Sequence, residues 1–195
     1  IILPTLGKGK DKYGHDTAPT IGVNFLANTA SLKSIDLSKI SLVQSLPYGF
    51  MSFTESLNEI NLDSLDRVTT IGSKFLAGSA VSSVDLSVMD KMTAESAEIG
   101  VNFLAKCWNL KTVKMGDIKA SQIVGGVDAT LDPTSSDYWK KYEPTCFVMY
   151  TEEKQTLLTA NEEYTYTSPE IYVYSAEKDN YVAKFGNIAP ERQNN

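Results

Sequence analysis

The residues that could take part in catalysis are few, and the first of them is a single histidine. His15 follows directly after the glycine- and lysine-rich stretch GKGKDKYG (7–14). A serine hydrolase would need this histidine as its base, with the nucleophile on a strained G-x-S-x-G turn. Nothing near His15 has that motif. The stretch also lacks the strand-then-helix context of a phosphate-binding loop. We therefore expect His15 to be a solvated residue on an exposed loop.

The sequence has two cysteines, Cys107 and Cys146. A zinc site takes about four nitrogen and sulfur ligands at clustered spacings, and two distant cysteines with one histidine do not supply them. Asp132 and Asp137 lack the D-x-D-x-D-G pattern of a calcium loop. Two cysteines are also too few for a disulfide scaffold, and they leave the redox compartment open. We expect no metal and no cofactor.

Two adjacent acidic pairs are the remaining candidates for catalysis. Glu152-Glu153 and Glu162-Glu163 lie in turn-like sequence. Glycosidases place two carboxyl groups across a substrate cleft, and a sequence alone does not exclude that geometry. A solvated acidic surface is the simpler interpretation. A glycan-directed enzyme is thus a remote alternative, and we expect that the chain is not an enzyme.

The composition narrows the classes of protein further. The chain has 195 residues, 42% of them hydrophobic, and a net charge of −6. The apolar content is sufficient for a substantial core. The negative charge argues against nonspecific nucleic-acid binding and against electrostatic docking on anionic membranes. No apolar run reaches the roughly 18 residues of a transmembrane helix. The start, Ile1–Pro4, is too short for a signal peptide, and we expect it to be the end of a strand from which an upstream segment was removed.

The dominant feature of the sequence is a segment that occurs four times. The first copy is IGVNFLANTASLKSIDL (21–37), the second LPYGFMSFTESLNEINL (46–62), the third IGSKFLAGSAVSSVDL (71–86) and the fourth IGVNFLAKCWNLKTVKM (99–115). The fifth residue of every copy is a phenylalanine, followed by Leu or Met; the four are Phe25, Phe50, Phe75 and Phe103. Each copy ends on an L-x-x-I-x-L-like stretch. This spacing of about 25 residues indicates a repeat architecture.

The two halves of a copy have different hydrophobic periods. Ile21 and Phe25 are four residues apart, which predicts one helical turn. Ile35-Asp36-Leu37 alternates, which predicts a half-buried strand. One unit cannot bury both of its apolar edges, whereas stacked units can. We therefore predict an α/β repeat solenoid of about four units of roughly 25 residues, with the strands in a parallel sheet and short helical turns opposite.

The I-G-x-x-F-L openings and the S-L-x-x-I-x-L endings resemble the BspA-like class of leucine-rich repeats, found in surface proteins of host-associated bacteria and some protozoa. The resemblance covers residues 21–115. The family often has Cys-x-x-Leu at the turn between opening and ending, and CWNL at 107–110 matches it; the aligned positions of the other copies hold the small residues Thr29, Thr54 and Ser79. The resemblance implies leucine-rich repeats and adhesion to macromolecules of a host or a neighbouring cell. It also implies an extracellular or bacterial cell-surface location.

The composition changes after about residue 125, since eight of the ten tyrosines lie beyond residue 130. We predict that residues 1–117 form the repeat solenoid. Residues 118–195 are expected to form a C-terminal cap and a small β-rich extension with a loose tail, because the apolar end of a solenoid needs a cover. The sequence predicts a short helix over 132–144 and strands over 146–151, 162–167, 170–175 and 180–185. The tyrosines are expected to pack in the sheet; the alternative is an aromatic platform for sugar or peptide.

The residues between the apolar positions of the four strands are the candidate binding residues. The apolar side chains of L-x-x-I-x-L face the core, so the intervening side chains face solvent. Parallel stacking would align them in a strand-face ladder, acidic over three copies and basic at the fourth. The ladder consists of Ser34, Asp36, Glu59, Asn61, Ser83, Asp85, Thr112 and Lys114. Solenoids commonly bind partners on such a surface. A plain solvated face is the alternative, because the ladder lacks an aromatic anchor.

Together these features favour a noncatalytic, cell-surface or secreted protein that binds an extracellular protein or glycan, as a monomer. The alternative is a structural or accessory subunit of a bacterial envelope complex, such as a surface lipoprotein. A lipid-modified cysteine in the precursor would favour that alternative. We expect no nucleic-acid partner and no transmembrane segment in this chain.

Overall fold

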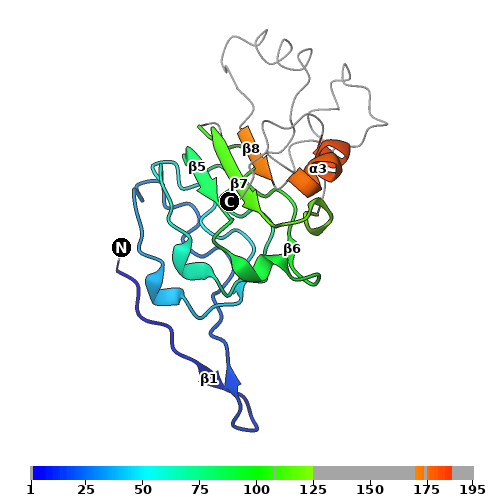
Figure 1. The fold of residues 1–195 in the computed structure, drawn as a ribbon. Coiled ribbons are helices and arrows are strands. Elements are labelled where there is room, and N and C mark those ends of the chain that lie inside the picture. The colour runs from blue at the N-terminus through cyan, green and yellow to red at the C-terminus, as the bar shows by residue number, and fades with distance from the viewer. Residues whose placement is uncertain (1, 108, 125–169, 174, 186–195) are drawn as a thin grey trace.

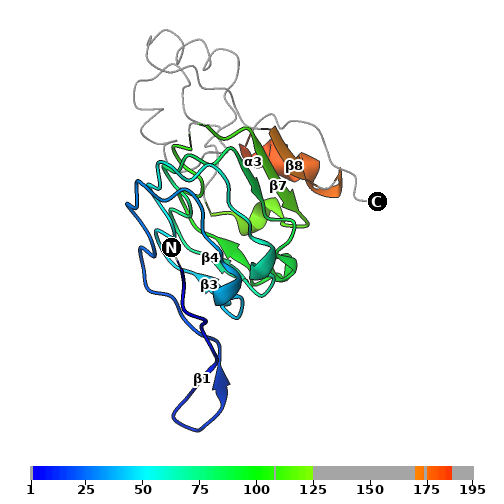
Figure 2. The same ribbon diagram turned by 90° about the vertical axis from the view of Figure 1, so that its left-hand side faces the viewer.

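The computed structural model describes residues 2–107, 109–124, 170–173 and 175–185. The four copies lie side by side in sequence order, and the N-terminal residues and β8 lie at opposite ends of this arrangement (Figures 1 and 2). Several of the predicted elements and candidate residues fall outside the described residues. They are the helix over 132–144, the strands over 146–151 and 162–167, and the two acidic pairs at 152–153 and 162–163.

Two parallel sheets run across the copies. The first sheet contains β3 (Ser45–Leu46), β4 (Thr70–Ile71) and β6 (Glu98–Ile99), and Ile123 adds an isolated parallel bridge to Ile99. The second sheet contains β5 (Ser83–Asp85), β7 (Thr112–Gly116) and β8 (Glu170–Val173). In the first sheet Leu46 pairs with Ile71 and Ile71 pairs with Ile99. These are the opening residues of the second, third and fourth copies, so the register of the sheet follows the repeat.

Strand pairing at the L-x-x-I-x-L endings begins only at the third copy. The endings of the first and second copies, 32–37 and 57–62, are not strands. One backbone hydrogen bond links the second ending to the third, from Ser82 N to Asn58 O at 3.0 Å. The parallel sheet predicted across four endings therefore covers the third copy, the fourth copy and β8.

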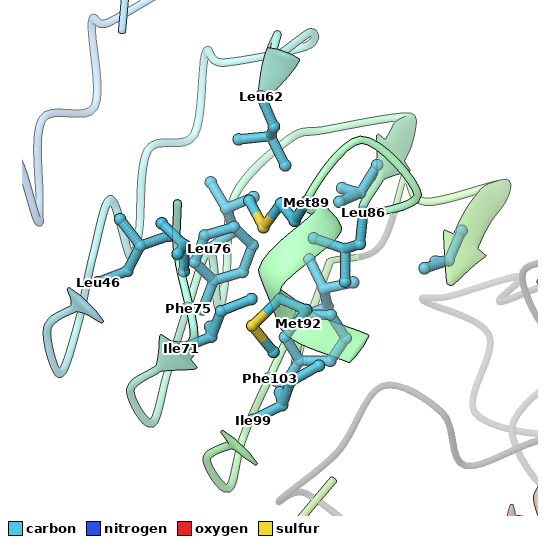
Figure 3. Packing of buried hydrophobic residues seen from close by; sticks show 14 of the residues in the cluster. Leu46, Leu62, Ile71, Phe75, Leu76, Leu86, Met89, Met92, Ile99 and Phe103 are labelled. Carbon is cyan, nitrogen blue, oxygen red and sulfur yellow. The ribbon is translucent and has the colours of Figure 1, made fainter. Parts of the chain in front are cut away.

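The core consists of the repeated apolar positions. Figure 3 shows Leu46, Ile71 and Ile99 pointing from neighbouring strands toward one interior. Met89 and Met92, from the linker after the third copy, point into the same interior. All five side chains are at most 1% exposed. Each fully buried side chain of this kind contributes roughly 1.5–3 kcal/mol, so the core depends on having neighbouring copies in place.

The recurring phenylalanines form a continuous stack through this core. The ring centroids of Phe25 and Phe50 are 5.4 Å apart, those of Phe50 and Phe75 are 5.8 Å apart, and those of Phe75 and Phe103 are 5.7 Å apart. The planes of neighbouring rings are inclined by 10–19°. Phe50, Phe75 and Phe103 are fully buried, whereas Phe25 is partly buried. Each ring thus packs against the equivalent ring of the next copy.

The openings of the copies are not helical, contrary to the prediction from the spacing of Ile21 and Phe25. They are turns in which every second residue has a positive φ. In the third copy Lys74, Leu76 and Gly78 have φ values of 61°, 52° and 69°. An α-helix needs a negative φ at every residue, so this alternation excludes one.

The alternating backbone directs hydrogen bonds to the neighbouring copies. Leu76 N donates to Phe50 O of the preceding copy at 2.9 Å, and Gly78 N donates to Ala105 O of the following copy at 2.7 Å. The same pattern links the first copy to the second, where Met51 N donates to Phe25 O at 2.8 Å. A helix would satisfy these groups within one copy. The turns instead use them to hold consecutive copies together.

Short helices occupy the linkers instead. The 3-10 helices are η1 (Ser38–Ile40), η2 (Asp63–Leu65), η3 (Asp90–Thr93) and η4 (Ala120–Gln122). η1 and η2 begin directly after the first and second L-x-x-I-x-L endings, and η3 and η4 begin a few residues after the third and fourth. Ile40 and Leu65 are buried, so the linkers add apolar residues to the core.

The C-terminal part of the chain contributes a strand and a helix. The strand predicted over 170–175 corresponds to β8, which is followed by η5 (Ser175–Glu177). The strand predicted over 180–185 is wrong, because Lys178–Phe185 forms the helix α3. The apolar residues of this segment fit both periods, and Asp179 in the first turn favours the helix. Among the described residues no helix is long and apolar enough to span a membrane.

A β-hairpin interrupts the chain before the first copy. Its strands β1 (Gly9–Lys10) and β2 (Asp16–Thr17) pair antiparallel, and the hairpin projects from the stacked copies (Figures 1 and 2). Lys8 Nζ and Lys10 Nζ lie 3.3 and 3.2 Å from the carboxylate of Asp16. The glycine- and lysine-rich stretch is thus an exposed hairpin.

Candidate functional site

Strands β5 and β7 bring half of the strand-face ladder together. Ser83 pairs with Thr112, and Asp85 pairs with Lys114. Ser83 is exposed and the other three residues are partly buried. The residue between each pair on its strand, Val84 or Val113, is fully buried. The four ladder residues therefore lie on the outer face of the sheet.

The other four ladder residues do not join this sheet. Ser34, Asp36, Glu59 and Asn61 are all exposed, but they belong to endings that form no strand. The prediction of two ladders over four copies assumed strands in every copy. The structure arranges the ladder as a sheet surface at the third and fourth copies alone.

Three ladder residues have a structural role. A side-chain oxygen of Asp36, of Asn61 and of Asp85 accepts the backbone N–H two residues further on, at 2.9, 2.8 and 3.1 Å respectively. Such contacts stabilise a turn directly after each of these three ladder residues. Hydrogen bonds from the side chain and backbone of Ser38 hold the pKa of Asp36 below its usual value. The side-chain oxygen at this position thus serves the turn, whether or not a partner binds there.

An ion pair joins the two strands at the fourth copy. Lys114 Nζ lies 2.8 Å from Asp85 Oδ2. Partial burial acts to raise the pKa of Asp85, but hydrogen bonds from Lys114 and Ser87 outweigh it, so the pKa lies below the usual value. The Asp85 carboxyl group is therefore ionised at neutral pH and pairs with the ammonium group of Lys114. This part of the face is therefore electrically balanced rather than basic.

Strand β8 adds residues that the ladder prediction did not include. Glu170 is in register with Thr112, and Tyr172 is in register with Lys114. Tyr172 is partly buried and brings an aromatic side chain to a surface that was expected to have none. The alternating sequence of residues 170–175 predicted this strand. The pairing of that strand with β7 could not be predicted, because more than fifty residues separate them and no repeat pattern connects them.

The lone histidine and the repeat cysteine have no catalytic partners among the described residues. His15 is 76% exposed on the hairpin, and its Nδ1 lies 3.0 Å from Asp11 Oδ2. Cys107 is buried, and its Sγ donates to Leu76 O at 3.1 Å. Burial raises the pKa of the Cys107 thiol to about 11, with Ser79 acting weakly in the opposite direction. Cys107 therefore packs as a small core residue rather than as a nucleophile.

Comparison of the chain with models of known protein families, with curated proteins and with solved structures finds no match. Function has to be argued from the surfaces of this molecule. Within the described part of the chain, exposed side chains that are suited to binding lie on the outer face of β5, β7 and β8 and on the exposed side of the opening turns.

Proposed function

We propose that the chain is a leucine-rich-repeat solenoid of the BspA-like class. It acts as a noncatalytic binding protein, secreted or at the cell surface, and recognises an extracellular protein or glycan. Its strand face forms a polar and salt-sensitive contact. In this solenoid one parallel sheet runs along the openings and another along the endings, the 3-10 helices follow the endings, and residues 118–195 act as the C-terminal cap.

The observation that carries this proposal is the register between copies. Equivalent residues of consecutive copies lie opposite one another in β3, β4 and β6, and again in β5 and β7. A regular stack of this kind exposes the same position of each copy in a row, which gives an extended surface without a deep cleft. Extended surfaces of repeat proteins are suited to macromolecular partners.

Binding to a panel of extracellular-matrix proteins and neutral polysaccharides at low and high salt tests the proposal. The informative variant is Glu59→Lys with Ser83→Arg, because both residues are exposed and neither holds a turn. Asp36 and Asp85 are poor choices, since their loss would disturb the backbone. We expect a partner whose binding weakens at high salt and is lost in the double variant.

The matched control is Glu55→Lys, an exposed acid outside the ladder. It should keep the binding of the unmodified chain. If binding survives in the double variant, the partner uses another surface. If the unmodified chain binds nothing in the panel, the adhesion-like function is wrong.

The edge of the first copy supports an accessory subunit as the second candidate. Tyr48 O and Ser73 O each accept a backbone N–H from the preceding copy, at 2.7 and 2.8 Å. Among the described residues, none donates to the equivalent carbonyl of Val23. The Val23 side chain is 70% exposed. This edge has the hydrogen-bonding groups with which another protein could pair.

A photocrosslinking residue at position 23 tests the accessory-subunit function in the producing cell. The same photocrosslinking residue in place of Ser83 is the control, because it reports on partners of the strand face. A crosslink to one envelope protein from position 23, and none from position 83, would favour the subunit. The reverse result would favour the strand face and the adhesion-like function.

A further inference from the structure

A small pocket lies among the opening turns of the second, third and fourth copies. Its volume is about 190 Å³, and it is lined by Phe53, Lys74, Ala77, Gly78, Asn102, Ala105 and Lys106. None of these residues belongs to the strand-face ladder. Pockets for drug-sized molecules have volumes of about 300–1,000 Å³, so this one has room for a single sugar ring or side chain.

The repeat itself creates the pocket. Phe53, Gly78 and Lys106 are the eighth residues of their copies. Phe53 N donates to Ala77 O and Gly78 N donates to Ala105 O, both at 2.7 Å, so these positions lie next to one another. The middle position has no side chain. A Cβ at Gly78 would lie 2.6 Å from the Phe53 ring, so the missing side chain lets this ring lie over Gly78 and form a wall of the pocket.

A second row of residues forms the side of the pocket. Lys74 and Asn102 are the fourth residues of the third and fourth copies. Lys74 Nζ lies 5.3 Å from the centroid of the Tyr48 ring. Tyr48 is 44% exposed and Phe53 is 41% exposed. The Lys74 ammonium and the Asn102 amide thus line the same pocket as the exposed Phe53 ring, and the ammonium also contacts the Tyr48 ring.

The charge of the lining favours an anion. Lys74 brings a positive charge to the lining, and none of the lining residues is acidic, although the whole chain has a net charge of −6. A lysine ammonium pairs with a carboxylate through a charge-assisted hydrogen bond. The side-chain amide of Asn102 can donate to and accept from hydroxyl groups. The exposed ring of Phe53 offers an apolar face beside these polar groups.

We propose that this pocket binds a uronic acid residue of an acidic polysaccharide. The carboxylate pairs with Lys74, a sugar hydroxyl meets Asn102, and the C–H face of the sugar ring packs on Phe53. A glutamate side chain of a peptide would satisfy the lysine but has no flat face to cover the aromatic ring. The inference rests on the proposed binding function and deepens it by naming the ligand class.

Titration of the full chain with polygalacturonate by calorimetry tests the proposal. Neutral galactan and poly-glutamate serve as comparison ligands. The variants are Phe53→Asn and Lys74→Asn, since the first copy has Asn28 and Asn24 at these positions and all four residues have a positive φ. Lys33→Asn removes the same charge from an exposed site outside the pocket. We expect binding that falls roughly tenfold in each pocket variant and is unchanged in Lys33→Asn.

Three results would overturn the inference. The first is a loss of affinity in Lys33→Asn equal to that in the pocket variants. The second is binding of poly-glutamate as tight as that of polygalacturonate, and the third is no polygalacturonate binding at all. In the last case a panel partner that depends on Glu59 and Ser83 would leave the proposed function standing. Absence of both kinds of binding would reject the inference and the proposed function together.

Discussion

At the scale of single residues, the phenylalanine stack shows how a repeated residue type becomes a structural element. Phe50 has a ring neighbour on both sides, whereas Phe25 has one among the described residues. Aromatic pairs add about 0.5–1.5 kcal/mol beyond the area they bury. The recurrence of phenylalanine was evident in the sequence. The ring stacking was not, because it depends on how closely consecutive copies approach.

Replacement of Phe50 by alanine should lower the free energy of unfolding by about 3–5 kcal/mol, since it removes a fully buried ring from the interior of the stack. Phe25→Ala should cost clearly less, because Phe25 is partly buried and stands at the end of the stack. Urea unfolding followed by circular dichroism measures both. Equal losses would show that the two positions are equally buried in solution.

The Cys107 thiol should be unreactive in the folded protein. It is 1% exposed, and burial raises its pKa to about 11, so almost no thiolate forms at pH 8. The experiment uses a Cys146→Ser background and a disulfide-exchange reagent at pH 8. We expect slow labelling in buffer and fast labelling in denaturing urea. Fast labelling of the native protein would contradict the burial of this side chain.

At the scale of elements, the opening turns are where prediction from the sequence failed. The four-residue spacing of Ile21 and Phe25 fits a helix, but it also fits a turn with alternating signs of φ. Positive φ at a leucine costs roughly 1–2 kcal/mol, so sequence reasoning does not expect it at Leu76 and Leu104. The hydrogen bonds between copies offset this cost. They form only in the stack and are therefore not visible in one copy.

Replacing the glycine of the I-G opening should destabilise the protein only where the preceding copy packs against that glycine. A Cβ at Gly100 would lie 2.5 Å from Ser73 N, whereas a Cβ at Gly22 would meet nothing within 4 Å. Gly100→Ala should therefore destabilise the protein by about 1–3 kcal/mol or more, because backbone must move. Gly22→Ala is the control at the same repeat position and should change stability little. Thermal unfolding of both variants distinguishes them, and similar midpoints would contradict the close packing of the copies.

At the scale of the whole molecule, the repeat predicted parallel strands at the L-x-x-I-x-L endings, and β5 and β7 pair there. The parallel pairing of Leu46, Ile71 and Ile99 in the first sheet was not predicted, because it lies at the openings, where a helical turn was expected. The end of the stack was harder to predict. β8 joins β7 from a distant part of the chain, and no pattern in the sequence specifies that partner. The expected alignment of the ladder residues is found between β5 and β7. The ladder also included Asp36 and Asp85, which hold turns, and this role could not be predicted because it depends on local backbone geometry.

Helix α3 should be able to detach without unfolding the copies, because Tyr181 is the one buried anchor among the α3 side chains that the structure describes. Tyr181 is fully buried, and its hydroxyl donates to Ile118 O at 2.7 Å. Tyr181→Phe loses this hydrogen bond, at a cost of about 1 kcal/mol, and Tyr181→Ala loses the packing as well. Hydrogen exchange should therefore accelerate in peptides covering 175–185, most in Tyr181→Ala, while peptides covering 46–62 stay protected. Tyr48→Phe, at an exposed ring, is the control. Equal acceleration in both regions would mean that the helix and the copies unfold as one unit.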